Sequence, residues 1–416
     1  MMKDNKVKLY TIIILLFMFQ PVIEGLFSAF KYYDEIVVLW FFCCYIISIV
    51  RKGNIGKRYA KILLVFVLFC VIGICGNIIS RSGQPKAAIL QDVFSNGKMI
   101  LFALSIHNVS LNIRQKRQLE DIVSFLVRLL FVIMFVTAVL SQFVDIGMVA
   151  KARYGIKSYR FLFNNPAGLN TYYYLYMILY SITITKNGRI RQHSTFFTAI
   201  GVVPWIMTMR SRAIAFAVIY LGLYFYILYF RKPGKAYKFK WYQIILVGIV
   251  AIILSWDAID KYFISNDKVA RYNLMHTSFM LAKDFFPIGS GFGSFGTEAS
   301  RVYYSSIYLR YGISQIYGLN MEHPTYITDQ FWFGIIGQFG VLGTFLMAYQ
   351  IFKIYKDIWM FSKYQKKNQL ACVVLFITSL FASLTAGTFI QASIIPSIMI
   401  IYLLADNNVD RFLCGR

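Results

Sequence analysis

The sequence has few acidic residues, few histidines and no patterned cysteines. Aspartate and glutamate together number 18 against 43 lysines and arginines, and the 416 residues include only 4 histidines. Neither the histidines nor the six cysteines stand at metal-ligand spacing, so we expect no bound metal and no disulfide framework. Tandem repeats and inverted halves are also missing, and many transporters have such halves.

Long apolar runs make up most of the chain. Hydrophobic residues account for 58% of it, and charged residues fall mostly between runs of membrane-spanning length. Because the runs are continuous rather than alternating, they predict helices and not a barrel. The predicted fold class is all-α, a polytopic integral membrane protein with about twelve transmembrane helices and one large extracytoplasmic loop. The expected spans are 9–27, 36–50, 59–80, 87–107, 122–144, 166–185, 195–209, 213–230, 241–256, 326–352, 370–386 and 388–405.

The strong basic excess is interpreted through the membrane. A formal net charge of +25 in a soluble protein would suggest nucleic acid, but here it indicates topology and contact with anionic membrane lipids. With both termini inside, the inner loops collect most of the basic residues and the short outer loops carry few. We therefore expect a multi-pass protein with cytoplasmic termini and no nucleic-acid partner.

Three outer segments of this topology carry basic residues against the insertion bias. Their arginines are Arg153 and Arg160 in one loop, Arg210 and Arg212 in a tight turn, and Arg271, Arg301 and Arg310 in a long polar loop. Guanidinium groups bind phosphate oxygens with two bonds each, so these residues are candidates for holding an anionic ligand. The alternative is that the arginines of the turn extend to interfacial water and that a long loop is translocated whatever its charge.

The long polar loop divides the chain into three parts. We expect a membrane domain over 1–256 with nine spans, an extracytoplasmic loop with short helices over 257–325, and a second membrane part over 326–416 with three spans and a cytoplasmic tail. An amphipathic helix on the membrane surface is predicted over 267–284. Loops of this length are usually functional or disordered, so the loop is the predicted active-site element.

Two motifs accompany this loop. Gly289-Ser-Gly-Phe-Gly293 resembles a phosphate-binding loop, but no strand and helix frame it as a dinucleotide site requires, so we expect no cofactor. It is either a sharp turn that brings N–H groups near an anion or a plain loop. His323 stands before a span beside Glu322 and Asp329, where an imidazole can take a proton from a hydroxyl, although a lone interfacial histidine is also simply amphipathic.

Charges inside the predicted spans are few. Asp92 and Lys98 both lie in the span 87–107, but their spacing puts them off a common helical face, so we expect no direct pair between them. They are expected to face a polar cavity. A transporter or flippase would have charges deep in several spans, and the sequence shows few.

One further set of motifs occurs in a specific order along the chain. In order, they are Phe163-Asn-Asn-Pro166, Arg210-Ser-Arg212, Arg271, Pro287-Ile-Gly-Ser-Gly-Phe-Gly293, and His323-Pro-Thr-Tyr-Ile before a helix with Gly337, Gly340 and Gly343. With these motifs the chain resembles the O-antigen polymerase and ligase superfamily of bacterial envelope enzymes, the Wzy-type polymerases and WaaL-type ligases. Such polymerases also have an arginine and a glycine at a fixed spacing, which Arg301 and Gly312 fit but the first basic loop does not.

The resemblance implies a GT-C-like fold and a metal-independent glycosyltransferase in the bacterial inner membrane. The substrate would be an undecaprenyl-pyrophosphate-linked oligosaccharide, polymerised at the outer face into O-antigen or capsular polysaccharide, with a chain-length regulator as a further partner. The implied catalytic residues are His323, Arg212 and Arg271, and the implied pyrophosphate- or glycan-binding residues are Arg210, Arg301, Arg153, Arg160 and Arg310. The alternatives are a ligase that transfers the glycan to lipid A core and, in another class, a polysaccharide transporter or flippase.

Overall fold

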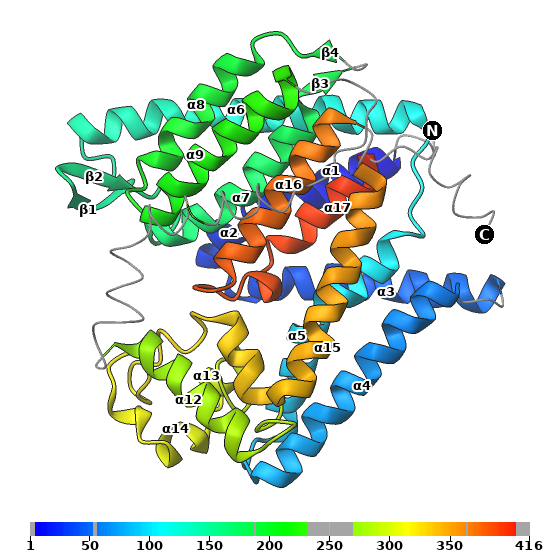
Figure 1. Cartoon of the computed structure of the whole chain (residues 1–416). Coiled ribbons are helices and arrows are strands. Elements are labelled where there is room, and N and C mark those ends of the chain that lie inside the picture. Colours follow the sequence, from blue (N-terminus) through cyan, green and yellow to red (C-terminus); the bar gives the residue numbers. More distant parts are fainter. Residues whose placement is uncertain are drawn as a thin grey trace.

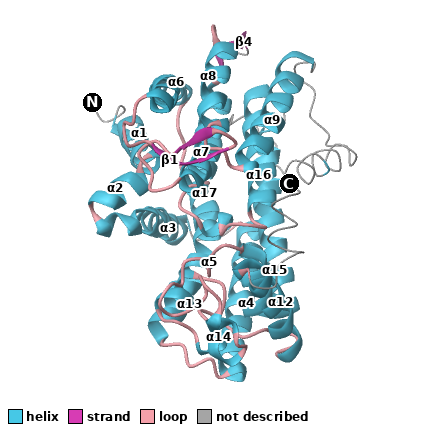
Figure 2. Ribbon diagram, turned by 90° about the vertical axis from the view of Figure 1, so that its left-hand side faces the viewer, coloured by secondary structure: helices cyan, strands magenta, loops and turns pink. Residues whose placement is uncertain are grey.

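The computed structural model describes residues 5–52, 56–186, 189–230, 249, 269–362 and 365–404. Over these ranges the chain forms a helical bundle with two short β-hairpins, and a lobe of small helices lies at one end (Figures 1 and 2). Six described helices are long and apolar enough to cross a membrane, or seven if the bent pair α1 and α2 is one span. The protein is therefore a helical membrane protein, as predicted, while twelve spans remain a prediction.

The elements follow the sequence closely. The bundle helices are α1 (Asn5–Met18), α2 (Gln20–Leu26), α3 (Tyr33–Lys52), α4 (Lys57–Ser80), α5 (Lys86–Ile106), α6 (Ile113–Phe143), α7 (Pro166–Thr183), α8 (Ser194–Ile206), α9 (Ser211–Phe225), α15 (Phe331–Ser362), α16 (Lys366–Ala382) and α17 (Ile394–Leu404). The lobe contains α12 (Ala270–Asp284), α13 (Glu298–Val302) and α14 (Ser306–Arg310). Short helical turns are η1 (Ser28–Tyr32), η2 (Tyr226–Phe230), η4 (Ile313–Gln315) and η5 (Thr388–Ile390). Antiparallel hairpins join β1 (Val149–Arg153) to β2 (Ile156–Tyr159) and β3 (Thr185–Lys186) to β4 (Arg189–Ile190).

Most long apolar runs became the expected helices. The membrane-length helices α3, α4, α5, α6, α9 and α15 coincide with predicted spans. The predicted span 9–27 is not one helix, because α1 and α2 meet at an angle of 71°. Pro21 lies in the first turn of α2, where its missing N–H breaks no helical bond, so it favours a new helix start. The predicted span 241–256 lies outside the described residues, apart from residue 249.

Helix α7 is enclosed by the bundle and is rich in tyrosine. α6, α16 and α17 pack against it, and every residue from Tyr172 to Thr183 is buried. A buried phenol needs a hydrogen-bond partner. The Tyr176 hydroxyl donates to the Met18 carbonyl at 2.7 Å, and the Tyr180 hydroxyl donates to the start of α8 at 2.5 Å. These tyrosines therefore connect α7 to α1 and α8.

The helix ends gather at two opposite ends of the bundle. At one of them, which we term the loop end, α4 and α16 end, α9 and α15 begin, and the lobe packs on them. At the other end, Arg191 beyond β4 pairs with Asp121 in α6, and Lys367 in the first turn of α16 pairs with Glu120. These contacts show neighbouring helices running in alternating directions, as repeated crossing of a membrane requires.

The two charges inside α5 have separate partners. Lys98 pairs with the Asp34 carboxylate of α3 at 2.5 Å, and the Gln20 amide of α2 donates to the same carboxylate at 3.1 Å. Asp92 instead binds groups of the lobe. The two residues thus face different neighbours, as their spacing predicted. Because removing one partner of a buried ion pair is strongly destabilising, the pair holds α3 against α5.

Candidate functional site

Arg212 lies in the first turn of α9, at the loop end. Its Nη1 donates to the Thr385 hydroxyl at 2.6 Å and approaches the Thr385 carbonyl oxygen at 3.5 Å. Arg210 occupies the N-cap position of the same helix. The Arg212 side chain is half-buried, and no carboxylate in the described ranges pairs with it. A cation beside the positive end of a helix dipole, with no carboxylate partner, leaves a position that favours an added anion.

Arg271 lies in the first turn of α12 and pairs with Asp329, just before α15. Its Nε and Nη2 both donate to Oδ2 of Asp329, at 3.1 and 2.7 Å. The two side chains are 20% and 27% exposed, so the pair remains accessible. Because both bonds go to Oδ2, the Oδ1 atom keeps lone pairs that can accept a hydroxyl proton. Sequence reasoning considered Asp329 only as a neighbour of His323 and missed this pairing.

Arg212 and Arg271 approach the same place from different helices. The Phe331 N–H at the start of α15 donates to the Ser383 carbonyl oxygen just after α16, at 3.3 Å. The chain before α15 therefore runs beside the chain after α16, and each of these segments carries the partner of one arginine. We term the following set the arginine junction: Arg212, Thr385, Arg271 and Asp329.

His323 lies on an exposed part of the lobe. Its backbone N–H donates to the Asn320 side chain at 3.0 Å, and its ring centre is 5.8 Å from that of Tyr317. No hydrogen bond or ion pair in the described ranges joins His323 to the arginine junction. Between the two, Asp329 is the better placed as a base, because it lies within the arginine junction whereas His323 does not.

Arg301 and Arg310 have partners in and beside the lobe. Arg301 pairs with Glu298 one turn earlier, and this hydrogen-bonded carboxylate raises the pKa of the Arg301 guanidinium. Arg310 donates to the Ser80 carbonyl at 2.9 Å and approaches the Arg81 carbonyl at 3.5 Å. It thus binds carbonyl groups at the end of α4 that have no intrahelical partner.

The arginines of the first basic loop lie by the β1–β2 hairpin. Arg153 is exposed at the end of β1. Arg160 follows β2 and donates to the carbonyls of Gly147 at 2.9 Å and Asn164 at 3.2 Å. The hairpin packs on α6 close to the loop end, but neither arginine forms a hydrogen bond or ion pair with the arginine junction in the described ranges.

The glycine-rich loop over 287–297 connects α12 to α13 along the chain and is hydrogen-bonded to α15. Helix α15 is interrupted at Gly340, whose φ of 57° and ψ of −157° suit glycine alone. The loop fills this interruption, because the N–H groups of Ser290 and Gly291 donate to carbonyls of the preceding turn of α15 at 3.0 and 2.7 Å. The loop therefore supplies hydrogen bonds that the broken helix cannot make for itself.

Other N–H groups of this loop also have acceptors in the bundle. The Gly293 N–H donates to the Asp92 carboxylate at 2.6 Å, and that carboxylate also accepts from the Gln338 amide at 2.8 Å. The Phe292 N–H donates to the Asn77 amide oxygen at 2.9 Å. With these donors occupied, the geometry supports the plain-loop alternative over a phosphate-binding turn.

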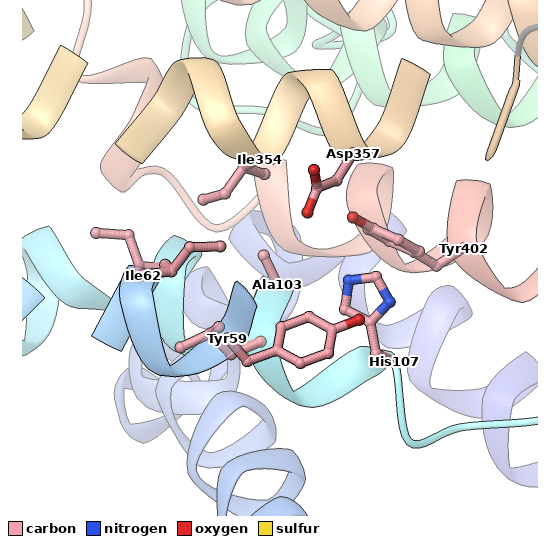
Figure 3. A pocket seen from close by; sticks show the side chains of 9 residues that line it. Tyr59, Ile62, Ala103, His107, Ile354, Asp357 and Tyr402 are labelled. Atoms are coloured by element: carbon pink, nitrogen blue, oxygen red, sulfur yellow. The ribbon is translucent and has the colours of Figure 1, made fainter. Parts of the chain in front are cut away.

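A second polar cluster lies at the end of the bundle opposite the lobe. Tyr59, His107, Asp357 and Tyr402 point into one small pocket between α4, α5, α15 and α17 (Figure 3). The His107 ring centre is 5.0 Å from that of Tyr59 and 4.6 Å from that of Tyr402. This pocket lies away from the arginine junction, and His107 is the last residue of the predicted span 87–107, to which sequence analysis assigned no pocket.

No protein-family model matches the chain, and a search of curated proteins found no match. Within the described ranges, no group of three or more His, Cys, Asp or Glu side chains could hold a metal ion.

Proposed function

We propose that the protein is a glycosyltransferase that polymerises undecaprenyl-pyrophosphate-linked oligosaccharide repeat units. The reaction would take place at the outer face of the bacterial inner membrane, with the loop end outside and both termini in the cytoplasm. The main support is the position of Arg212. It is half-buried at a helix N-terminus, has no carboxylate partner among the described residues, and lies beside the ion pair of Arg271 and Asp329.

The arginine junction suits a lipid-linked pyrophosphate. Arg212 lies in the first turn of a membrane-length helix. With the loop end outside, this helix end would lie near the depth where a carrier lipid presents its headgroup. Its Thr385 partner is uncharged, so its positive charge is available to phosphate oxygens. The charge of Arg271 is already neutralised by Asp329. Arg271 would therefore orient the pyrophosphate through directed hydrogen bonds more than it would add positive charge.

The chemistry requires few groups. A sugar hydroxyl of one repeat unit attacks the anomeric carbon of the growing chain, a new glycosidic bond forms, and the bond to pyrophosphate breaks. Asp329 Oδ1 takes the hydroxyl proton, and Arg212 stabilises the charge that develops on the departing undecaprenyl pyrophosphate. Pyrophosphate is a good leaving group, so positioning and charge stabilisation carry most of the catalysis.

The test compares glycans from cells that lack the gene and carry wild-type, Arg212→Ala or Arg189→Ala copies. Arg189 is an exposed arginine of β4, at the end opposite the loop end, and is the matched control. Chain length is resolved on gels for lipid-linked and surface glycans, with protein abundance measured in parallel. Single repeat units on the final acceptor are expected for the null strain and Arg212→Ala, and long chains for wild type and Arg189→Ala.

Three other outcomes would contradict the proposal or its site. Long chains stranded on the lipid carrier would indicate a ligase that passes finished glycan to lipid A core. Unchanged glycans in the null strain would exclude both glycosyl transfer roles. Normal elongation by Arg212→Ala would remove that residue from the site.

A further inference from the structure

Gln330 is a buried amide without a partner beside the arginine junction. It lies between Asp329 and Phe331 and is 1% exposed, and neither its Nε2 nor its Oε1 has a hydrogen-bond partner among the described residues. Buried polar groups in proteins nearly always find a partner, because leaving one unpaired forfeits its hydration. An amide kept in this condition next to a candidate site suggests a ligand that completes it.

The neighbouring segment 383–393 has unpaired side chains too. Thr388 is 7% exposed and its Oγ1 has no partner, and the Gln391 Oε1 is also buried and unpaired. The segment lies against the start of α15, because the ring centres of Phe331 and Phe389 are 5.0 Å apart. The two segments that carry these unpaired atoms therefore lie side by side.

The backbone of segment 383–393 is, by contrast, well bonded. The N–H groups of Thr385, Thr388 and Ile390 each donate to a carbonyl two or three residues earlier, at 3.0, 2.9 and 3.0 Å. Its turns are thus complete without a ligand. The unpaired side-chain atoms of this segment therefore stand on a backbone that is held in place by these turns.

This segment also lies within the thickness of the bundle. Tyr402 of α17 contacts His107 at the opposite end, and α17 begins at Ile394, only about 12 Å earlier along the helix axis. Irregular backbone inside a helical membrane protein occurs where it is enclosed by protein or lines a polar cavity.

We propose that Gln330, Thr388 and Gln391 form a subsite for a neutral sugar ring attached to the pyrophosphate at the arginine junction. Amide and hydroxyl groups without charge match the alternating donors and acceptors of sugar hydroxyls. This inference rests on the proposed function, because it assigns the sugar that follows the bound pyrophosphate.

The test uses Gln330→Met, which keeps the side-chain volume and removes the amide. Gln350→Met is the matched control: Gln350 lies in α15, the helix that Gln330 directly precedes, is fully buried, and also has both amide atoms without a described partner, but it lies farther towards the opposite end. Each variant removes an unpaired buried amide, so both should melt at or above the wild-type temperature. If Gln330→Met fails to fold, Thr388→Val removes a hydroxyl of the same subsite with little change in shape.

The measurement is binding to purified protein in nanodiscs of two probes. One is undecaprenyl pyrophosphate, and the other is the same carrier with a repeat unit, extracted from the native cells. We expect wild type and Gln350→Met to bind the glycosylated probe about tenfold more tightly than the bare carrier. Gln330→Met should bind both probes alike, with an unchanged affinity for the bare carrier.

The outcomes separate this inference from the function on which it rests. A Gln330→Met protein that keeps the preference for the glycosylated probe overturns the subsite, as does a wild type that binds both probes equally. In either case binding of the bare carrier still supports the pyrophosphate site. A wild type that binds neither probe overturns the proposed function and the subsite with it.

Discussion

Replacing Asp92 by alanine should loosen the attachment of the glycine-rich loop to α5. The carboxylate accepts hydrogen bonds from the Gly293 N–H, the Gln338 amide and the Asn96 amide, and it is 1% exposed. Each buried donor left unpaired costs about 1–3 kcal/mol, so with partial relaxation the expected loss of unfolding free energy is about 3–5 kcal/mol. For a chain of this length, that corresponds to a fall of about 3–6 °C in the unfolding midpoint.

The assay is thermal unfolding in detergent together with limited proteolysis of the exposed lobe around Met321. Asp92→Asn is the matched control, because its amide oxygen can still accept from Gly293 and Gln338, and we expect a loss of about 1 kcal/mol. An alanine variant with wild-type midpoint and protease resistance would refute the reasoning. Equal losses in both variants would show that the negative charge matters more than the hydrogen bonds.

Other predictions concern the site and the topology. His323→Ala should keep turnover within about threefold of wild type, whereas Asp329→Asn should lower it at least about a hundredfold in an elongation assay; the opposite ranking would favour His323 as the base. Arg310→Ala should cost about 1–2 kcal/mol of stability because it uncaps α4, with turnover retained below the midpoint; lost turnover in folded protein would place Arg310 at the substrate. In a cysteine-free background, Met321→Cys should react with a membrane-impermeant thiol reagent in intact cells and Arg189→Cys only after lysis; the reverse would invert the topology.

The membrane helices were predictable wherever a long apolar run is bounded by polar residues. The prediction of 59–80 matches α4, and 87–107 matches α5 despite the charges inside it. The bend at Phe19 was not predictable from hydropathy, because apolar residues continue past it at Val22 and Ile23. Pro21 was the local signal, but a proline can equally kink a single span.

The site was predictable in part. Arg212 and Arg271 stood out because basic side chains at an expected outer position run against the insertion bias. Their pairing with Thr385 and Asp329 depends on how distant segments pack, and no local sequence pattern predicts that packing. The glycine-rich motif suggested an anion, and the anion found there is a carboxylate of the same chain, Asp92.

The interruption of α15 bears on how the protein is made. The loop over 287–297 leaves the ribosome before α15, yet its amides complete the turn at Gly340. Until the two meet, carbonyls exposed by the break would lie in lipid, where each unpaired group costs several kcal/mol. A newly inserted α15 is therefore expected to enter the bilayer as one continuous helix. Docking of the loop then breaks that helix into two segments at Gly340, so the loop end is expected to reach its final structure late in folding.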